Sequence, residues 1–232
     1  MRAEERQEIV RHPLLAACHP ETVDFLLQGA FVQRFPAHTQ LTREGEKADF
    51  LYAVLSGSVE LTAAWQDRET TIAVIGPPRT FIVAAVVLDR LYLQSARVLE
   101  PARILMLPSE SVRHAMSRDA GFATAIAKEQ ANAYRHVAQE LKNQKLRSSL
   151  ERLANWLVRR DKETGGGHRF IIPFEKKILA ARLGMAPEVL SRAFATLAQY
   201  DVRVDGATVI VKDWTALEKL AHPDPLIDDD TV

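Results

Sequence analysis

The sequence predicts an α+β chain with an N-terminal β-roll of the jelly-roll kind, one long helix and a C-terminal winged helix-turn-helix. Short β-like runs separated by turn residues occupy residues 31–108. An uninterrupted helical pattern follows from about residue 119 to residue 147. A helix–glycine–helix pattern then precedes two short β-like runs near the C-terminus. We therefore expect a sensor domain at 1–117, a dimerisation helix at 118–146 and a DNA-binding domain at 147–232.

Bulk composition is that of a globular protein. The 232 residues are 47% hydrophobic and 26% charged, which is ordinary for folded domains. No apolar run approaches the roughly 18 residues of a membrane span, and the charged N-terminus lacks the apolar segment of a signal peptide. We expect a cytoplasmic protein. The single cysteine, Cys18, excludes an internal disulfide and disfavours an iron–sulfur cluster, which generally takes about four thiolates.

The charge is distributed unevenly although the net charge is zero. Residues 145–220 hold 14 Lys and Arg against 9 Asp and Glu, a net of +5, whereas the remainder holds 16 against 21, a net of −5. A basic C-terminal part on an acidic body suits a module that binds a polyanion such as DNA.

The β-like region begins after a stretch of short helices that ends near Gly29. Its runs read FVQRF, FLYAVLSGSVELTAAW, TTIAVIG, SARVL and ARILMLP, and turn residues including Gly57 and Pro101 separate or interrupt them. Regularly spaced short strands of this kind indicate a barrel or sandwich. A barrel of this size can enclose one small ligand.

The long helical pattern contains no glycine or proline after Gly121. At 1.5 Å per residue it would be about 40 Å long, well beyond the mean helix of a globular protein. A narrow apolar stripe favours a coiled-coil-like dimer seam, although a helix packed on its own barrel is an alternative. The stripe consists of residues at four- and seven-residue steps: Phe122, Ile126, Ala133, Val137 and Leu141.

Residues 175–200 carry the pattern of a helix-turn-helix. A short helix is expected at Lys176–Leu183, Gly184 breaks it, and Pro187 suits the first turn of a second helix at Pro187–Tyr200. This helix–turn–helix spacing is typical of DNA-binding domains. In the second helix Leu190, Phe194 and Leu197 share the face expected to lie in the core.

Another face of the second helix presents Glu188, Ser191 and Arg192 near its N-terminal end, where a recognition helix meets base edges. Arginine can donate two hydrogen bonds to guanine, and glutamate can accept one from cytosine. A plain surface ion pair between Glu188 and Arg192 is the alternative interpretation.

The run VRVDGATVIVKD follows and predicts a two-stranded wing that turns at Asp205-Gly206. Basic side chains around this domain are candidates for phosphate contacts, which position a protein on DNA without reading sequence. These candidates are Arg169, Lys176, Lys177 and Lys212.

These features together resemble the CRP/FNR family of bacterial transcription regulators over nearly the whole chain. FPAHTQLTREGEKADFLYAVLSGSVEL is similar to that family's cyclic-nucleotide-binding-type β-roll, and the E-x-x-S-R set Glu188, Ser191 and Arg192 is similar to its FNR-like recognition helix. The resemblance implies a homodimer on a two-fold-symmetric site with TTGAT-like half-sites, and RNA polymerase as a further partner.

The sensor departs from the cyclic-nucleotide binders of the family. Ala84 stands where they carry glutamate for the ribose, and Gln94 where they carry arginine for the phosphate, so a cyclic nucleotide would lack its charged partner. The resemblance then extends to NnrR-like regulators of nitrogen-oxide respiration and to regulators of aromatic-acid metabolism. Haem is a possible cofactor, with axial candidates His12, Cys18, His19 and His38. A small-anion pocket could be lined by Tyr52, Tyr92, Gln94 and Arg97.

The sequence also bears on two other classes of function. A small-molecule- or haem-binding sensor that acts without sequence-specific DNA binding is the alternative to a regulator. An enzyme is not expected, since no H-E-x-x-H, G-x-S-x-G, C-x-x-C or Walker motif occurs. The effector, the target genes and the choice between activation and repression are left open by the sequence.

Overall fold

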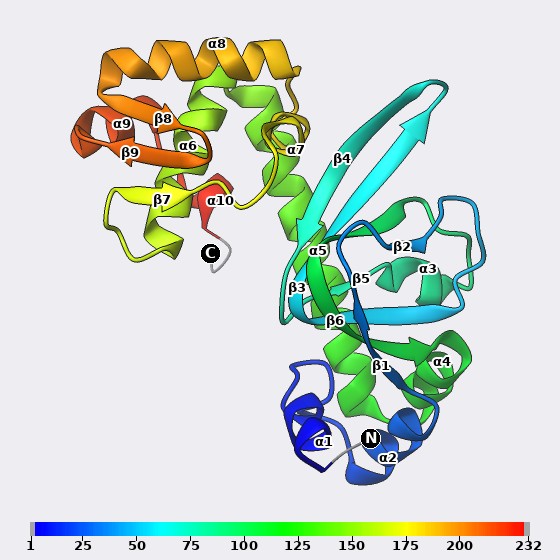
Figure 1. Ribbon diagram of the computed structural model, residues 1–232. Helices are drawn as coiled ribbons and strands as arrows, with labels where there is room; N and C mark the ends of the chain where they lie inside the picture. Colours follow the sequence, from blue (N-terminus) through cyan, green and yellow to red (C-terminus); the bar gives the residue numbers. More distant parts are fainter. Residues whose placement is uncertain (1–2, 230–232) are drawn as a thin grey trace. The chain divides into compact units, whose positions relative to one another are not determined.

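The computed structural model describes residues 3–229, and the chain forms two compact units, residues 1–133 and 134–232. Helix α5 (Ala120–Leu146) continues from the first unit into the second. Its bounds lie within two residues of the helix expected at 118–146. Figure 1 labels the helices and strands of both units.

The first unit is an antiparallel β-roll flanked by helices, as the alternation of short strands and turns predicts. Its sheet has the order β1-β6-β3-β4, with β2 paired to β6 and β5 paired to β3. Helices α1 (Ala3–Val10) and α2 (Pro20–Gln28) precede the sheet, and α4 (Ser109–Arg118) follows it. The strands are β1 (Phe31–Phe35), β2 (Gln40–Thr42), β3 (Phe50–Trp65), β4 (Arg68–Ile75), β5 (Thr80–Phe81) and β6 (Ser95–Pro108).

Strand β6 corrects one expectation, because SARVL and ARILMLP form a single strand that runs through Pro101. The register of β3 on β6 shifts on both sides of Gly57, so Pro101 lies at an irregularity where a missing N–H is tolerated. Gly57 has φ +78°, and a Cβ built there would lie 2.3 Å from the carbonyl oxygen of Pro101. Only glycine fits this close approach of the two strands.

Helix α3 (Val83–Leu88) lies inside a run that the sequence pattern did not identify as helical. The run is apolar and short, and periodicity alone does not distinguish a buried strand from a buried helix at that length. Both flanking residues, Ile82 (φ 64°) and Asp89 (φ 52°), adopt left-handed backbone conformations. These two residues, and no glycine or proline, delimit the helix.

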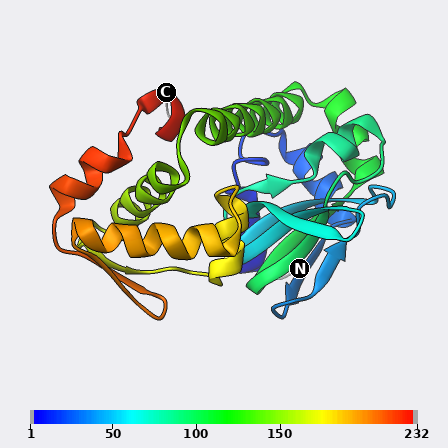
Figure 2. The ribbon, with the colours of Figure 1, turned by 90° about the horizontal axis from the view of Figure 1, so that it is seen from above.

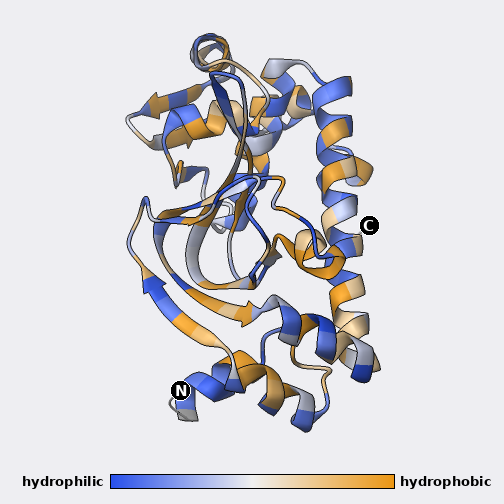
Figure 3. Cartoon of the chain, turned by 90° about the vertical axis from the view of Figure 1, so that its right-hand side faces the viewer, coloured by the Kyte–Doolittle hydropathy of each residue, from blue (hydrophilic) through white to orange (hydrophobic). Residues whose placement is uncertain are grey.

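The first half of α5 packs onto its own unit. Phe122 is 0% and Ile126 2% exposed within the core of the β-roll, and Glu129 accepts a hydrogen bond from the hydroxyl of Thr80 at 2.7 Å. Placing Phe122 and Ile126 in a dimer seam was therefore wrong, because side chains already buried in one chain have no surface to offer another. Apolar residues nevertheless recur along the rest of the helix (Figure 3).

Asp119 fixes the start of α5. Its carboxylate accepts hydrogen bonds from the backbone N–H of Phe122 at 3.0 Å and from that of His19 at 2.8 Å. A hydrogen bond from the Thr22 hydroxyl, with those from the backbone N–H groups, lowers the pKa of Asp119 to about 2. One side chain thus caps the long helix and ties the N-terminal segment to it.

The second unit is a winged helix-turn-helix, as expected. A sheet of order β7-β9-β8 backs the helices, and β8 and β9 form the hairpin that turns at Gly206, with φ +57°. Its elements are α6 (Ser149–Glu163), β7 (Arg169–Ile171), α7 (Lys176–Arg182), α8 (Pro187–Leu197), β8 (Val202–Asp205), β9 (Thr208–Val211), α9 (Trp214–Ala221) and α10 (Pro225–Asp228). A 3-10 turn at Ala198–Tyr200 replaces the expected last turn of α8.

Candidate DNA-binding interface

The turn between α7 and α8 has the backbone geometry that the sequence requires. Gly184 has φ +61°, and a Cβ there would lie 3.2 Å from the side chain of Gln144, so glycine serves both the turn and the close packing. The N–H of Met185 donates to the carbonyl oxygen of Ala180 at 3.0 Å. Pro187 begins α8, where its missing N–H costs no helical hydrogen bond.

The inner face of α8 packs into the core of the second unit. Leu190 is 2%, Ala193 7% and Leu197 0% exposed. Phe194, which was expected on this face, packs at the core margin and is partly buried. The ammonium group of Lys176 lies 5.7 Å from the centroid of its ring. The small side chain of Ala193 lets α8 lie close to the core, and the bulkier Phe194 is displaced to the edge.

Glu188, Ser191 and Arg192 are all exposed on α8. They occupy positions i, i+3 and i+4, which lie on one face of a helix, and they belong to its first two turns. Figure 2 shows α8 along one side of this unit with the β8–β9 hairpin projecting past it. The helix therefore offers an acceptor, a hydroxyl and a guanidinium together to the solvent.

The four candidate phosphate-binding residues are exposed as well. Lys176 and Lys177 form the first turn of α7, Arg169 begins β7, and Lys212 follows β9. They therefore lie on elements directly connected to the helix-turn-helix and its wing.

Tyr52 and Tyr92 come together inside the first unit. Both are 4% exposed, Tyr52 stacks on Phe81 at a centroid distance of 5.0 Å, and burial raises the pKa of both phenols, which also hydrogen-bond each other. The phenol of Tyr92 donates to the carbonyl oxygen of Phe50 at 3.4 Å. Both tyrosines are neutral members of the core.

Arg97 lies on β6, where it pairs with Glu60 of β3. Its neighbours Ala96 and Val98 are 0% exposed in the core, so alternation along β6 turns Arg97 to the opposite face of the strand. Its guanidinium pairs with Glu60 at 2.7 Å, and Glu60 also accepts from the hydroxyl of Thr71 at 2.6 Å. The grouping of Arg97 with Tyr52 and Tyr92 stays a prediction. Gln94 lies half-buried just before β6.

The four haem-ligand candidates differ in their surroundings. His12 is 5% exposed, and burial lowers its pKa. Burial, with a smaller contribution from the charge of Asp119, raises the pKa of Cys18 to about 11, which opposes the thiolate that a metal takes. His19 and His38 are exposed. Within residues 3–229 no three His, Cys, Asp or Glu side chains gather as a metal site.

Arg152 is a structural residue that sequence reasoning missed. It is 8% exposed, and its guanidinium donates to the carbonyl oxygens of Leu183 at 2.8 Å and Arg147 at 2.7 Å. The pKa of Arg152 is lowered by burial. It sits at position 152 within an amphipathic helix pattern, where the sequence alone gives an arginine no reason to be buried.

Comparisons with known proteins agree with this architecture. Residues 32–119 match the cyclic nucleotide-binding domain and residues 151–220 the Crp-like helix-turn-helix domain. The cyclic AMP receptor protein of Thermus thermophilus is 28% identical over 211 residues, 90% of this chain and 96% of that protein.

Two solved structures are similar over most of the chain. One, from Ruegeria pomeroyi and described as cyclic nucleotide binding, is 25% identical with TM-score 0.62, over 96% of this chain and 100% of that one. The other is from Eubacterium rectale and is described as a CRP/FNR-family transcriptional regulator. It has TM-score 0.75 and 17% identity, over 91% of this chain and 98% of that one. At this identity, the similarity to the Eubacterium rectale structure shows a shared fold only.

A cyclic-nucleotide-binding-type β-roll followed by a long helix and a Crp-like helix-turn-helix defines a class of DNA-binding transcription regulators. In both of these domains the chain is similar to the CRP/FNR family of such regulators. Among the described residues, no helix combines the length and the apolar character needed to cross a bilayer.

Proposed function

We propose that this protein is an effector-responsive regulator that binds a palindromic, FNR-like DNA site as a homodimer in the cytoplasm, in contact with RNA polymerase. The observation that carries the proposal is the exposed set Glu188, Ser191 and Arg192 on a helix whose opposite face is buried. Arg192 is suited to guanine and Glu188 to cytosine, while Ser191 can contact a base or a phosphate.

The second half of α5 supports the homodimer. Val137 is 64% and Leu141 55% exposed, and Ala133 is also exposed. These three residues recur every four positions, so they form one apolar stripe on the helix. An apolar stripe open to solvent on a long helix is suited to pairing with the same stripe of a second copy.

Two recognition helices related by two-fold symmetry would read half-sites about 34 Å apart, one turn of DNA. Effector binding in the β-roll would then bias α5 between arrangements that do and do not reach both half-sites, a shift of populations. The exposed Ala84 and the half-buried Gln94 argue against a cyclic nucleotide as this effector, because Ala84 has no polar group for a ribose and Gln94 has no charge for a phosphate. An NnrR-like role with haem is one candidate within this proposal.

The test is fluorescence anisotropy of a labelled duplex with two TTGAT half-sites in inverted repeat, against a scrambled duplex of equal length. We expect tighter binding to the repeat by at least tenfold, with loss of that preference when one half-site is scrambled. Equal affinity for both duplexes at all salt concentrations would reject sequence reading. Absence of any DNA binding would favour the alternative, a sensor acting without DNA.

A further inference from the structure

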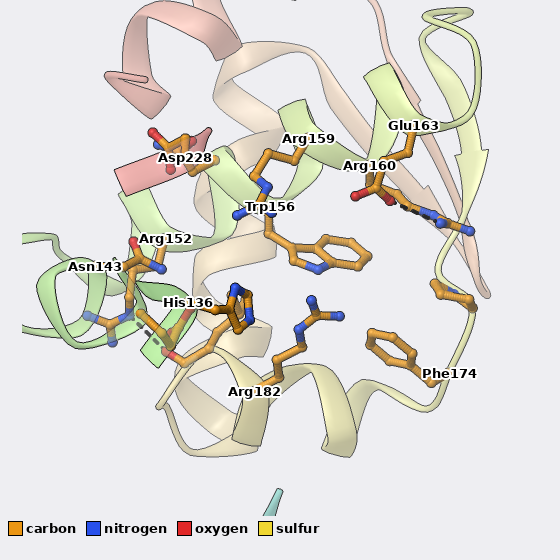
Figure 4. A pocket seen from close by; sticks show the side chains of 14 residues that line it. His136, Asn143, Arg152, Trp156, Arg159, Arg160, Glu163, Phe174, Arg182 and Asp228 are labelled. Carbon is orange, nitrogen blue, oxygen red and sulfur yellow. Dashed lines mark hydrogen bonds and ion pairs between the residues drawn. The ribbon is translucent and has the colours of Figure 1, made fainter. Parts of the chain in front are cut away.

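A pocket of about 90 Å³ lies in the second unit (Figure 4). Its walls come from α5, α6, the segment before α7, α7 itself and α10. None of the residues proposed to contact DNA lines it. A ligand in this pocket would therefore be distinct from both DNA and an effector in the β-roll.

The lining carries an excess of positive charge. Four arginines, Arg152, Arg159, Arg160 and Arg182, line the pocket with three carboxylates. One of the carboxylates, Asp228, is already neutralised from outside the pocket by Arg147, at 2.7 Å. Positive charge therefore exceeds negative charge by two, which favours an anionic ligand. A guanidinium has five donors, so an arginine with a protein partner can still bind a ligand oxygen.

Flat groups surround the centre of the pocket. The rings of Trp156 and Phe174 lie 6.0 Å apart between centroids at an interplanar angle of 55°. The guanidinium carbon of Arg182 lies 6.0 Å from the centroid of Phe174. Figure 4 shows the guanidinium of Arg182 pointing into the space between His136, Trp156 and Phe174. Aromatic rings prefer to pack on such surfaces in offset or tilted arrangements.

Two buried polar atoms of the lining residues are unsatisfied. Asn155 is 3% exposed and its Oδ1 atom has no hydrogen-bond partner among the described residues, and the same holds for Nε of Arg160. Buried polar atoms normally have a partner. Because both atoms are enclosed by protein, a ligand in the pocket would not reach them.

We propose that this pocket binds a small planar anion, an aromatic ring that carries a carboxylate. The carboxylate would accept paired hydrogen bonds from Arg182, and the ring would pack on Trp156 and Phe174. A buried water takes about 10–15 Å³ of such volume, so the pocket has room for roughly six to nine heavy atoms. Benzoate is a molecule of that size.

The test uses the full chain with benzoate, and with benzamide and acetate as matched probes lacking the charge or the ring. Calorimetry should show saturable binding of benzoate at least tenfold tighter than of benzamide or acetate. Quenching of Trp156 should accompany it, and the Trp156→Phe variant should bind benzoate with a smaller fluorescence change. Because the chain holds three tryptophans, this variant assigns the signal.

Arg182→Gln should weaken benzoate binding at least tenfold. Arg182→Lys keeps the positive charge but loses the paired hydrogen bonds of the guanidinium, so it should weaken binding less. Arg68→Gln, at an exposed position of β4 in the first unit, is the control and should bind as the parent does. Near-ultraviolet circular dichroism verifies that each variant is folded. Inorganic phosphate binding as tightly as benzoate, benzamide matching benzoate, or indifference to Arg182→Gln in a folded variant would each overturn the proposal.

Discussion

The Nε atom of Arg152 in α6 lies 2.8 Å from the carbonyl oxygen of Leu183, at the end of α7. The same guanidinium donates to the carbonyl oxygen of Arg147 at 2.7 Å, beyond the end of α5. Carbonyl groups at helix C-termini lack partners inside the helix. Arg152 therefore satisfies two such termini at once and joins the long helix to the turn of the helix-turn-helix.

Arg152→Met should lower the free energy of unfolding by about 1.5–3 kcal/mol, because buried carbonyls lose a charged donor. Urea denaturation followed by circular dichroism measures this loss. Arg118→Met, at an exposed end of α4, is the control and should change stability by less than about 0.5 kcal/mol. Equal effects from both substitutions would contradict the linking role of Arg152.

Arg192→Ala should weaken binding to the preferred duplex by about 1–3 kcal/mol and relax the preference at one base position, since a base contact is lost. Lys177→Ala should instead weaken binding to all duplexes similarly. It should also reduce the slope of log affinity against log salt concentration by about one. Anisotropy titrations at several salt concentrations distinguish the two. If Arg192→Ala weakened binding to all duplexes equally, the side chain of Arg192 would be assigned to a phosphate contact.

Val137→Lys should convert the protein from dimer to monomer, because it places a charge in the exposed apolar stripe of α5. Sedimentation equilibrium measures the change. Asn132→Lys is the control, since residue 132 lies about 140° away around the helix at 100° per residue. A parent protein that is already monomeric at micromolar concentration would contradict the proposed dimer interface along α5.

His12 should make stability depend on pH. Burial lowers its pKa, while the Glu129 charge and the Pro78 carbonyl act in the opposite direction and less strongly. The unfolded chain then binds a proton that the folded chain does not, so stability falls as pH drops below about 6.5 and levels off below the folded pKa. His12→Gln should flatten this slope in thermal melts between pH 7.5 and 5. If the His12→Gln variant kept the same slope of stability against pH, the pH dependence would come from titratable groups other than His12.

Gly57→Ala should destabilise the β-roll by about 1–3 kcal/mol, because the left-handed backbone and the Pro101 carbonyl both reject a Cβ. Gly76→Ala, where a Cβ meets nothing within 4 Å and φ is ordinary, is the matched control in the same unit. Melting temperatures of the two variants provide the comparison.

The helices and strands could be predicted where a periodic pattern of apolar residues was long or where a turn signal was strong. The bounds of α5 and the β8–β9 hairpin follow from an uninterrupted helical pattern and from Asp205-Gly206. Helix α3 and the passage of β6 through Pro101 did not follow, because tertiary packing overrides the local signals there. Pro101 is tolerated since it faces Gly57, a pairing that no local pattern reveals.

The sites divide in the same manner. The exposure of Glu188, Ser191 and Arg192 follows from helical geometry within one segment. Burial of Phe122 and Ile126 in their own unit could not be separated from a seam between chains, because both environments demand the same apolar spacing. The pocket around Trp156 and Arg182 joins residues distant in sequence, so its charge balance appears only in three dimensions.

Cys18 has a practical consequence. Because its pKa is raised to about 11, the thiol is almost entirely protonated at neutral pH, and it is the ionised thiolate that reacts with alkylating reagents. A cysteine introduced at an exposed position of this single-cysteine chain would therefore react far faster than the native one. Spectroscopic labels could be attached at chosen points without first removing any native residue.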